Sequence, residues 1–361
     1  MKIGIVTYHR TLNYGAVMQS LATRFILEEM GHKAYYVDYW PDYHRKLYKS
    51  FSLSKLIRYC LKLSVSDAIT YIKQSFWKKN RASSFYLFFN DFVNPYCRSI
   101  NEVFDVVVYG SDQIWRKQGA LGTYNPFYFG KNEIKAKRHI SYAASMGLLP
   151  ETKEDEQKVK NLVSHLDKIS VREEDLRQLL IKLGCSNVAL SLDPTLLLSG
   201  EMWDKYLPTK PYNGEKYALL YVIKTNAFDM TEVLNFTESK GLKLKVLQGY
   251  AITKETDTNL TTVDPSEFLR LIKNAEYIFS CSFHGLAFSI IYKKQFFASY
   301  VKNSGRAESL LNLIGASQRL LSPQVAIPQN IEAIDYIDVQ NRLASAKQES
   351  LRYLADALAL V

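Results

Sequence analysis

A lone histidine, His284, lies where an apolar strand is predicted to pass into an apolar helix. The segment FSCSFHGLAFSIIY predicts a strand over Tyr277–Ser280 and a helix over residues 285–292. In an open α/β sheet, ligands bind at the carboxyl ends of the strands, where the next helix offers free N–H groups. A histidine in this turn suits proton transfer, because its ordinary pKa lies near neutrality. A structural histidine that caps the helix fits the same position.

Two arginines at predicted helix starts could bind anions. Arg172 follows a strand in DKISVREED, and Arg306 opens a helix in NSGRAESLL. A guanidinium beside the positive end of a helix suits a carboxylate or a phosphate. The competing interpretations are an i,i+3 ion pair between Arg172 and Asp175, and a surface salt bridge for Arg306.

Other polar residues follow predicted strands and would reach the same edge of a sheet. Asp112, in YGSDQIW, could cap a following helix or orient a hydroxyl group. Ser282 and Gly285 share the turn of His284. The remaining candidates, expected on the acceptor side or elsewhere in the cleft, are Asn13, Gly15, Ser111, Gln113 and Ser145.

Several familiar sites have no support in the sequence. HExxH, paired cysteines and a His–carboxylate cluster are missing, so we predict no metal site. Neither GxGxxG after the first strand nor GxxxxGK[ST] occurs, and no GxSxG nucleophile elbow is present. We therefore expect no cofactor. The four cysteines are widely spaced, which fits a reducing cytoplasm.

Strands and helices alternate in two blocks, which predicts an α/β fold with parallel sheets. Residues 1–207 are expected to form an N-terminal Rossmann-like domain. The Pro/Gly-containing stretch PTKPYNGE then leads into a second Rossmann-like domain at 208–328. Residues 329–361 are expected to be helical and to pack back on the first domain. Two such domains would face a cleft lined by strand-to-helix turns.

A basic segment at about 42–98 interrupts the first block and is predicted to be a helical insertion. The stretch from His44 to Arg98 contains eleven Lys/Arg and two Asp, so it carries nine of the ten net positive charges of the chain. This aromatic, basic segment could lie on an anionic membrane, bind nucleic acid, or simply form a solvated helical face. MKIGIVTYHR has too short an apolar run for a signal peptide, and no run approaches the roughly 20 apolar residues of a membrane span.

Seven stretches, taken in order from Lys2 to Gly315, resemble the polysaccharide pyruvyl transferase family. They are KIGIVTYHRTLNYGAVMQSLA, VVVYGSDQIW, ISYAASMG, SVREEDLRQLLIKLG, LDPTLLL, FSCSFHGLAFSIIY and SGRAESLLNLIG. The resemblance implies a GT-B-like fold and phosphoenolpyruvate as donor. The acceptor would be a sugar of a cell-surface polysaccharide, such as exopolysaccharide or capsule, or its precursor, and the product a pyruvate ketal on two hydroxyls.

The resemblance also implies roles for individual residues. His284 and Asp112 would be catalytic, and the donor would be held by Arg172, Arg306, Ser282 and Gly285. A cytoplasmic enzyme acting on a lipid-linked acceptor would explain peripheral contact between the basic insertion and the inner membrane face, with no nucleic acid as partner. Two other functions stay open: a GT-B glycosyltransferase that uses a nucleotide sugar, and a non-catalytic protein that binds anionic lipid or nucleic acid.

Overall fold

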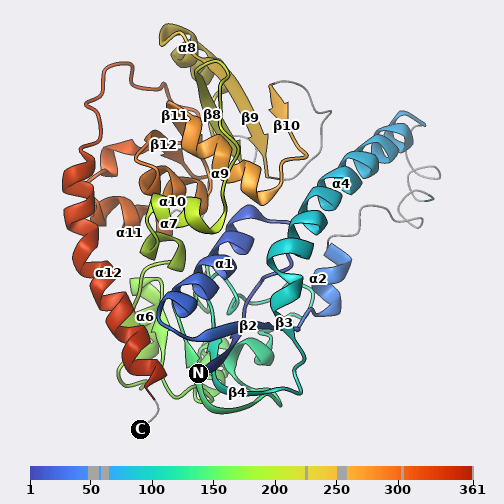
Figure 1. Ribbon diagram of the computed structural model, residues 1–361, viewed down its shortest axis with the longest axis vertical. Helices are drawn as coiled ribbons and strands as arrows, with labels where there is room; N and C mark the ends of the chain where they lie inside the picture. The colour runs from blue at the N-terminus through green and yellow to red at the C-terminus, as the bar shows by residue number, and fades with distance from the viewer. Residues whose placement is uncertain (48–56, 58–64, 224–226, 250–257, 302–304, 360–361) are drawn as a thin grey trace.

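Two parallel β-sheets, each covered by helices, lie one above the other along the long axis of the molecule (Figure 1). The computed structural model describes residues 1–47, 57, 65–223, 227–249, 258–301 and 305–359. The sheets lie at opposite ends of the view in Figure 1, and the C-terminal helix α12 (Tyr336–Leu358) runs along one side of both.

The first sheet has the strand order β3-β2-β1-β4-β5 within the described residues, and every pair is parallel. Its strands are β1 (Lys2–Val6), β2 (Lys33–Val37), β3 (Cys97–Arg98), β4 (Val103–Tyr109) and β5 (Lys135–Ser141). A short parallel pair, β6 (Ser170–Val171) and β7 (Ala189–Leu190), is joined to the β5 side by isolated bridges. This is the order of a nucleotide-binding Rossmann half extended at its edge.

The second sheet repeats that order as β10-β9-β8-β11-β12-β13, again parallel, among the residues described. Its strands are β8 (Tyr217–Val222), β9 (Lys243–Gln248), β10 (Asn259–Leu260), β11 (Tyr277–Ser280), β12 (Gln295–Ser299) and β13 (Leu320–Leu321). The predicted α/β fold with two Rossmann-like halves of GT-B type is confirmed. The domain boundaries proposed at 207/208 and 328/329 stay a prediction.

Short-range capping sets where the helices begin. Asn13 caps α1 (Tyr14–Glu29) through Ala16 N–H, and Asp264 caps α9 (Pro265–Asn274) through Glu267 N–H. The other helices are α2 (Asp42–Leu47), α4 (Val65–Phe92), α5 (Lys153–Val163), α6 (Glu174–Lys182), α7 (Gly200–Tyr206), α8 (Met230–Ser239), α10 (Phe283–Ile291) and α11 (Gly305–Leu313). Single 3₁₀ turns are η1 (Asn94–Tyr96), η2 (Pro126–Phe129), η3 (Pro194–Leu197) and η4 (Ser317–Arg319).

The segment predicted as a helical insertion is helical only in part. It includes α2 and α4, but its last residues form η1 and then β3, which pairs with β2 at the edge of the first sheet. Pro95 lies in η1 and cannot continue a helix, so the chain turns there and extends. Residues 48–56 and 58–64 lie outside the described part.

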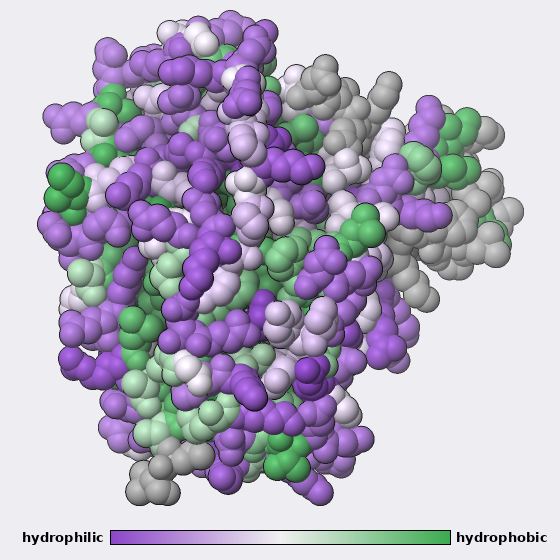
Figure 2. Space-filling model, viewed as in Figure 1, coloured by the Kyte–Doolittle hydropathy of each residue, from purple (hydrophilic) through white to green (hydrophobic). Residues whose placement is uncertain are grey.

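Helix α4 projects from the body of the molecule (Figure 1). Its inner end is anchored by buried Phe85, Phe88 and Phe89. Its outer end carries exposed Ile69, Ile72 and Phe76, and Figure 2 shows apolar surface there. Among the described residues no helix has the length and apolar character to cross a bilayer.

The C-terminal helix begins at Tyr336 and not near 330, because Asp335 caps it. Hydrogen bonds among the described residues join it to the first half of the chain. Tyr353 Oη donates to Ser141 O at 2.8 Å, Leu192 N donates to Ser350 Oγ at 3.0 Å, and Arg138 donates to Ala357 O at 3.2 Å. Helix α12 thereby supports the segment that leads into Asp193.

Candidate functional site

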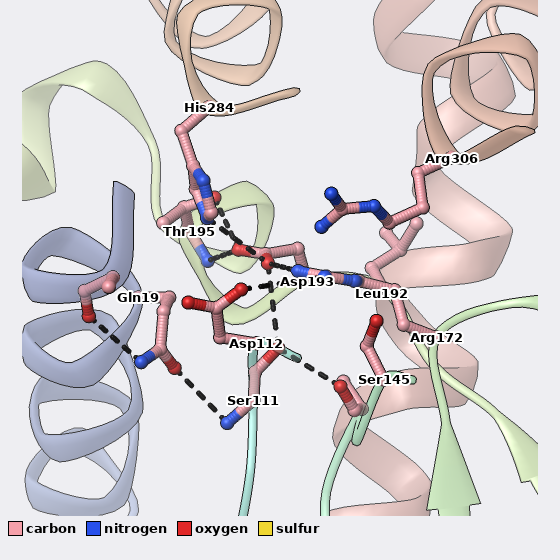
Figure 3. Close-up of polar contacts among 12 residues, drawn as sticks. Gln19, Ser111, Asp112, Ser145, Arg172, Leu192, Asp193, Thr195, His284 and Arg306 are labelled. Atoms are coloured by element: carbon pink, nitrogen blue, oxygen red, sulfur yellow. Dashed lines mark hydrogen bonds and ion pairs between the residues drawn. The ribbon is translucent and has the colours of Figure 1, made fainter. Parts of the chain in front are cut away.

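His284 lies in the first turn of α10, at the carboxyl end of β11. The helix starts at Phe283, two residues before the predicted start, because the Ser282 side chain caps it by accepting from Gly285 N. Ser282 therefore acts locally as an N-cap. The imidazole is 6% exposed and turned toward the first half of the chain (Figure 3).

Two glycines make room for this turn. A Cβ on Gly15, in the first turn of α1, would lie 2.1 Å from His284 Nδ1. A Cβ on Gly285 would lie 2.1 Å from Ser280 Oγ. Any other residue at either position would displace its neighbour, so both glycines allow close packing around the histidine.

Asp193 joins the two halves of the site. Its Oδ2 forms an ion pair with Arg172 and lies 3.4 Å from His284 Nε2 (Figure 3). Its Oδ1 accepts from Thr195 N at 3.0 Å and from Thr195 Oγ1 at 2.7 Å. Burial opposes ionisation of this fully buried carboxyl, but His284, Arg172 and Thr195 hold its pKa well below its ordinary value. Asp193 is thus a buried carboxylate that orients both an imidazole and a guanidinium.

Arg172, directly after β6, faces three carboxylates. Its ion-pair partners are Asp193, Glu173 at 3.5 Å and Asp112 at 3.9 Å, instead of the Asp175 considered from sequence. Its Nε and Nη2 are buried without a hydrogen-bond partner among the described residues. Burial opposes its charge, yet the three carboxylates raise the pKa of the guanidinium. Two buried donors without a hydrogen bond, on a permanent cation, favour an anionic ligand.

Arg306, in the first turn of α11, comes close to the same place. Its Nε lies 4.0 Å from Glu173 Oε1, and its guanidinium is 5.6 Å from the Phe283 ring centroid. The Arg172 guanidinium is 5.0 Å from the same centroid. Burial and the neighbouring Arg172 charge lower the pKa of Arg306. The Arg306 side chain keeps 19% of its surface exposed, so the cluster is accessible on this side.

Asp112 lies at the partly open edge of this cluster, with 17% of its side chain exposed. Its backbone is left-handed, with φ at 67°, and turns follow it in place of the helix that it was expected to cap. Ser111 beside it donates to Ala143 O at 3.0 Å and, through its N–H, to Gln19 Oε1 at 3.1 Å. Ser145 Oγ donates to Glu173 Oε1 at 2.5 Å.

The structure therefore brings together most, but not all, of the residues singled out from sequence. His284, Arg172, Arg306, Asp112, Ser111 and Ser145 belong to one hydrogen-bonded and ion-paired cluster (Figure 3). Asn13 is a helix cap, and Gln113 packs its side chain against Gly147.

Asp193, Glu173 and Gln19 join this cluster, and the sequence reasoning missed all three. The signal that could have found Asp193 is its place in LDPTLLL, one of the stretches that carry the family resemblance. In the described part of the chain, no group of three or more His, Cys, Asp or Glu could hold a metal ion.

Comparison with known proteins gave one family and a set of distant structures. The family model described as polysaccharide pyruvyl transferase matches residues 13–303. The UDP-GlcNAc 2-epimerase from Methanocaldococcus jannaschii has a TM-score of 0.46 at 12% identity, covering 95% of this chain and 92% of that one. The UDP-GlcNAc 2-epimerase from Neisseria meningitidis has a TM-score of 0.46 at 10% identity, covering 99% of each chain. The E. coli heptosyltransferase WaaC has a TM-score of 0.39 at 11% identity, covering 96% and 100%. The comparison with curated proteins gave no match.

Proposed function

Since the chain belongs to the polysaccharide pyruvyl transferase family, we propose that it transfers a pyruvyl group from phosphoenolpyruvate to two hydroxyls of one sugar. The product is a pyruvate ketal on a cell-surface polysaccharide or its precursor. The observation that carries the donor assignment is the pair of arginines, because two buried donors of Arg172 make no hydrogen bond among the described residues, and Arg306 lies close by against the same Glu173.

Phosphoenolpyruvate suits this pair because its C2 carries both a carboxylate and a phosphate ester. Arg172 would bind one group through Nε and Nη2, which make no hydrogen bond among the described residues, and Arg306 would bind the other. The guanidiniums of Arg172 and Arg306 lie 5.0 and 5.6 Å from the centroid of the Phe283 ring, so both lie beside the same ring. Burial and, after it, repulsion from Arg172 lower the pKa of Arg306, and an added dianion would relieve that repulsion.

The reaction needs one proton delivered to carbon and two removed from hydroxyls. Protonation of the enol methylene gives a methyl group and an electrophilic C2. One sugar hydroxyl adds to C2, and the second displaces phosphate. Of the two hydroxyl protons, one balances the proton placed on carbon and the other leaves with phosphate.

We assign the transfer of the proton to carbon to His284. Its Nε2 is buried, has no hydrogen-bond partner within the described chain, and lies 3.4 Å from the ionised Asp193 carboxylate. Such a carboxylate stabilises the imidazolium that forms in proton transfer and holds the ring in place. Asp112, partly exposed beside Arg172, is proposed to orient or deprotonate an acceptor hydroxyl.

The acceptor is proposed to be lipid-linked at the inner membrane face, with α4 in peripheral contact. The exposed Ile69, Ile72 and Phe76 lie on the same helix as Lys73, Lys78 and Lys79, a combination that anionic lipid attracts. The chain should co-sediment with phosphatidylserine vesicles at low salt, and Phe76→Ser should reduce the fraction that sediments. If the wild-type chain does not sediment with the vesicles, the proposed membrane contact of α4 is rejected.

The decisive experiment for the function is donor binding followed by turnover. Phosphoenolpyruvate should raise the melting temperature and uridine diphosphate should not; the reverse result would favour a nucleotide-sugar glycosyltransferase. Phosphate release should require a sugar diol. His284→Ala should abolish release, while His165→Ala, at an exposed histidine after α5, should not. Arg306→Gln should raise KM for phosphoenolpyruvate at least tenfold. Normal turnover in His284→Ala would overturn the proposal.

A further inference from the structure

One carboxylate oxygen contacts both of the arginines proposed to bind the donor. Glu173 Oε1 lies 3.5 Å from Arg172 Nε and 4.0 Å from Arg306 Nε, and it accepts a hydrogen bond from Ser145 Oγ at 2.5 Å. Three groups therefore converge on a single atom. The Glu173 side chain keeps 11% of its surface exposed, so water screens these charges less than it would on an open surface.

Helix capping does not explain why a glutamate stands at position 173. Glu173 is the N-cap residue of α6, with extended backbone, but its side chain makes no capping hydrogen bond. Ser, Thr, Asp and Asn are the residues that favour this position, and Asn13 and Asp264 do cap their helices in this chain. The carboxylate of Glu173 is instead directed to the serine and the two arginines.

Ser145 gives that carboxylate a fixed anchor. The serine is fully buried, and its N–H donates to Asp112 O at 3.1 Å. The backbone that leads into Glu173 is held to the same segment, because Arg172 N donates to Ala144 O at 3.1 Å. Glu173 Oε1 therefore has a defined place in the first half of the chain.

Arg306 depends on this carboxylate more than Arg172 does. Arg172 is also paired with Asp193 and Asp112. Arg306 reaches the cluster from α11 in the second half (Figure 3), and within the described chain Glu173 is the carboxylate that comes within 4.0 Å of it. Burial and then the charge of Arg172 lower the pKa of Arg306, whereas Asp112 and Glu173 raise it. Glu173 thus offsets a repulsion that would separate the two guanidiniums.

The two contacts leave guanidinium N–H groups available to a ligand. Distances of 3.5 and 4.0 Å exceed the roughly 2.7–3.2 Å of an N–H···O hydrogen bond. Arg172 Nε and Nη2 make no hydrogen bond among the described residues. A ligand can therefore accept from these groups while Glu173 still attracts both arginines.

We propose that Glu173 is a positioning residue: it holds Arg306 beside Arg172, so that the pair prefers a ligand with two anionic groups to a single anion. The inference rests on the proposed function, which supplies phosphoenolpyruvate as that ligand. It also favours product release. Once the bond between C2 and the phosphate oxygen breaks, phosphate has lost its link to the carboxylate, and the charge of Glu173 repels it.

The test compares two anions on the same protein. Isothermal titration calorimetry without a sugar acceptor gives the Kd of phosphoenolpyruvate and of inorganic phosphate, for wild type and for Glu173→Gln. The amide keeps an oxygen for Ser145 but removes the charge. The preference for phosphoenolpyruvate, which is the phosphate Kd divided by the phosphoenolpyruvate Kd, should fall about tenfold, the effect of one hydrogen bond to a charged group.

The direction of the change separates positioning from simple repulsion. If Glu173 only repelled anions, its neutralisation would help phosphoenolpyruvate more than phosphate, because phosphoenolpyruvate carries more negative charge, and the preference would rise. Damage to the fold would weaken both anions and lower the melting temperature of the free protein. In turnover, Glu173→Gln should raise KM for phosphoenolpyruvate and change kcat by less than about threefold.

Two other variants complete the test. Glu174→Gln, at the next residue and in an exposed ion pair with Arg177, is the matched control and should keep the wild-type preference. Ser145→Ala keeps the charge but removes its anchor, so it should also lower the preference, and it decides the matter if Glu173→Gln does not fold.

The wild-type result separates this inference from the proposed function. If wild type binds phosphoenolpyruvate no more tightly than phosphate, the donor assignment fails. If wild type shows the preference and folded Glu173→Gln keeps or increases it, the positioning role of Glu173 is refuted and the donor assignment stands.

Discussion

Replacing Asp193 with asparagine should destabilise the protein far more than the same change on the surface. Asp193 is fully buried, and its Oδ2 faces both Arg172 and His284. If the new amide keeps its oxygen toward Thr195, its NH₂ group meets two hydrogen-bond donors. A buried pair that loses one partner typically costs about 3–5 kcal/mol, so the free energy of unfolding should fall by that amount. Asp338→Asn, in a half-exposed i,i+4 pair with Arg342 at 2.7 Å, should cost less than about 0.5 kcal/mol.

Urea unfolding followed by tryptophan fluorescence measures the difference in the free energy of unfolding between wild type and Asp193→Asn. Repeating the measurement across a range of pH tests whether the carboxylate charge causes it. The folded pKa of Asp193 lies below its ordinary value of 3.8, so its contribution is present above pH 3.8 and is lost as pH falls through the folded pKa. The gap between wild type and Asp193→Asn should therefore hold from pH 7 to pH 5 and narrow below about 3.8. An Asp193→Asn protein within about 1 kcal/mol of wild type at pH 7 would refute Asp193 as the charge that balances this cluster.

Two further predictions use other features of the same region. Gly15→Ala should lower kcat/KM about 100-fold, because its Cβ would lie 2.1 Å from His284 Nδ1 and move the ring; Gly119→Ala, with open space around it, is the control. Equal activity in the two variants, by phosphate release, would contradict this. Burial lowers the pKa of His9 and of His44 from 6.5 to about 4, so both stay neutral when folded and take up protons on unfolding below pH 6.5. The free energy of unfolding should be highest above pH 6.5 and fall toward pH 4, by at most about 3 kcal/mol per histidine. In His44→Phe, the melting temperature should depend less steeply on pH. An unchanged slope would reject the claim that buried His44 stays neutral in the folded protein.

The fold could be predicted because its signals are local. Apolar runs predicted β11 at Tyr277–Ser280, and the caps Asn13 and Asp264 are residue types that favour helix starts. The segment 42–98 was less predictable. Its basic, aromatic composition masked β3, a two-residue edge strand that pairs with β2.

The amino-acid sequence by itself determined the alternation of strands and helices, and hence that polar residues after strands gather at sheet edges. Periodicity and capping depend on residues within about four positions of one another, so they are written locally. Only the tertiary structure decided that Asp193 would join Arg172, His284 and Ser111, the last of these 82 residues away, and that Gly15 would lie against an imidazole from the other half. Such contacts depend on how two sheets pack and on which buried charges must be neutralised, and no local pattern records either.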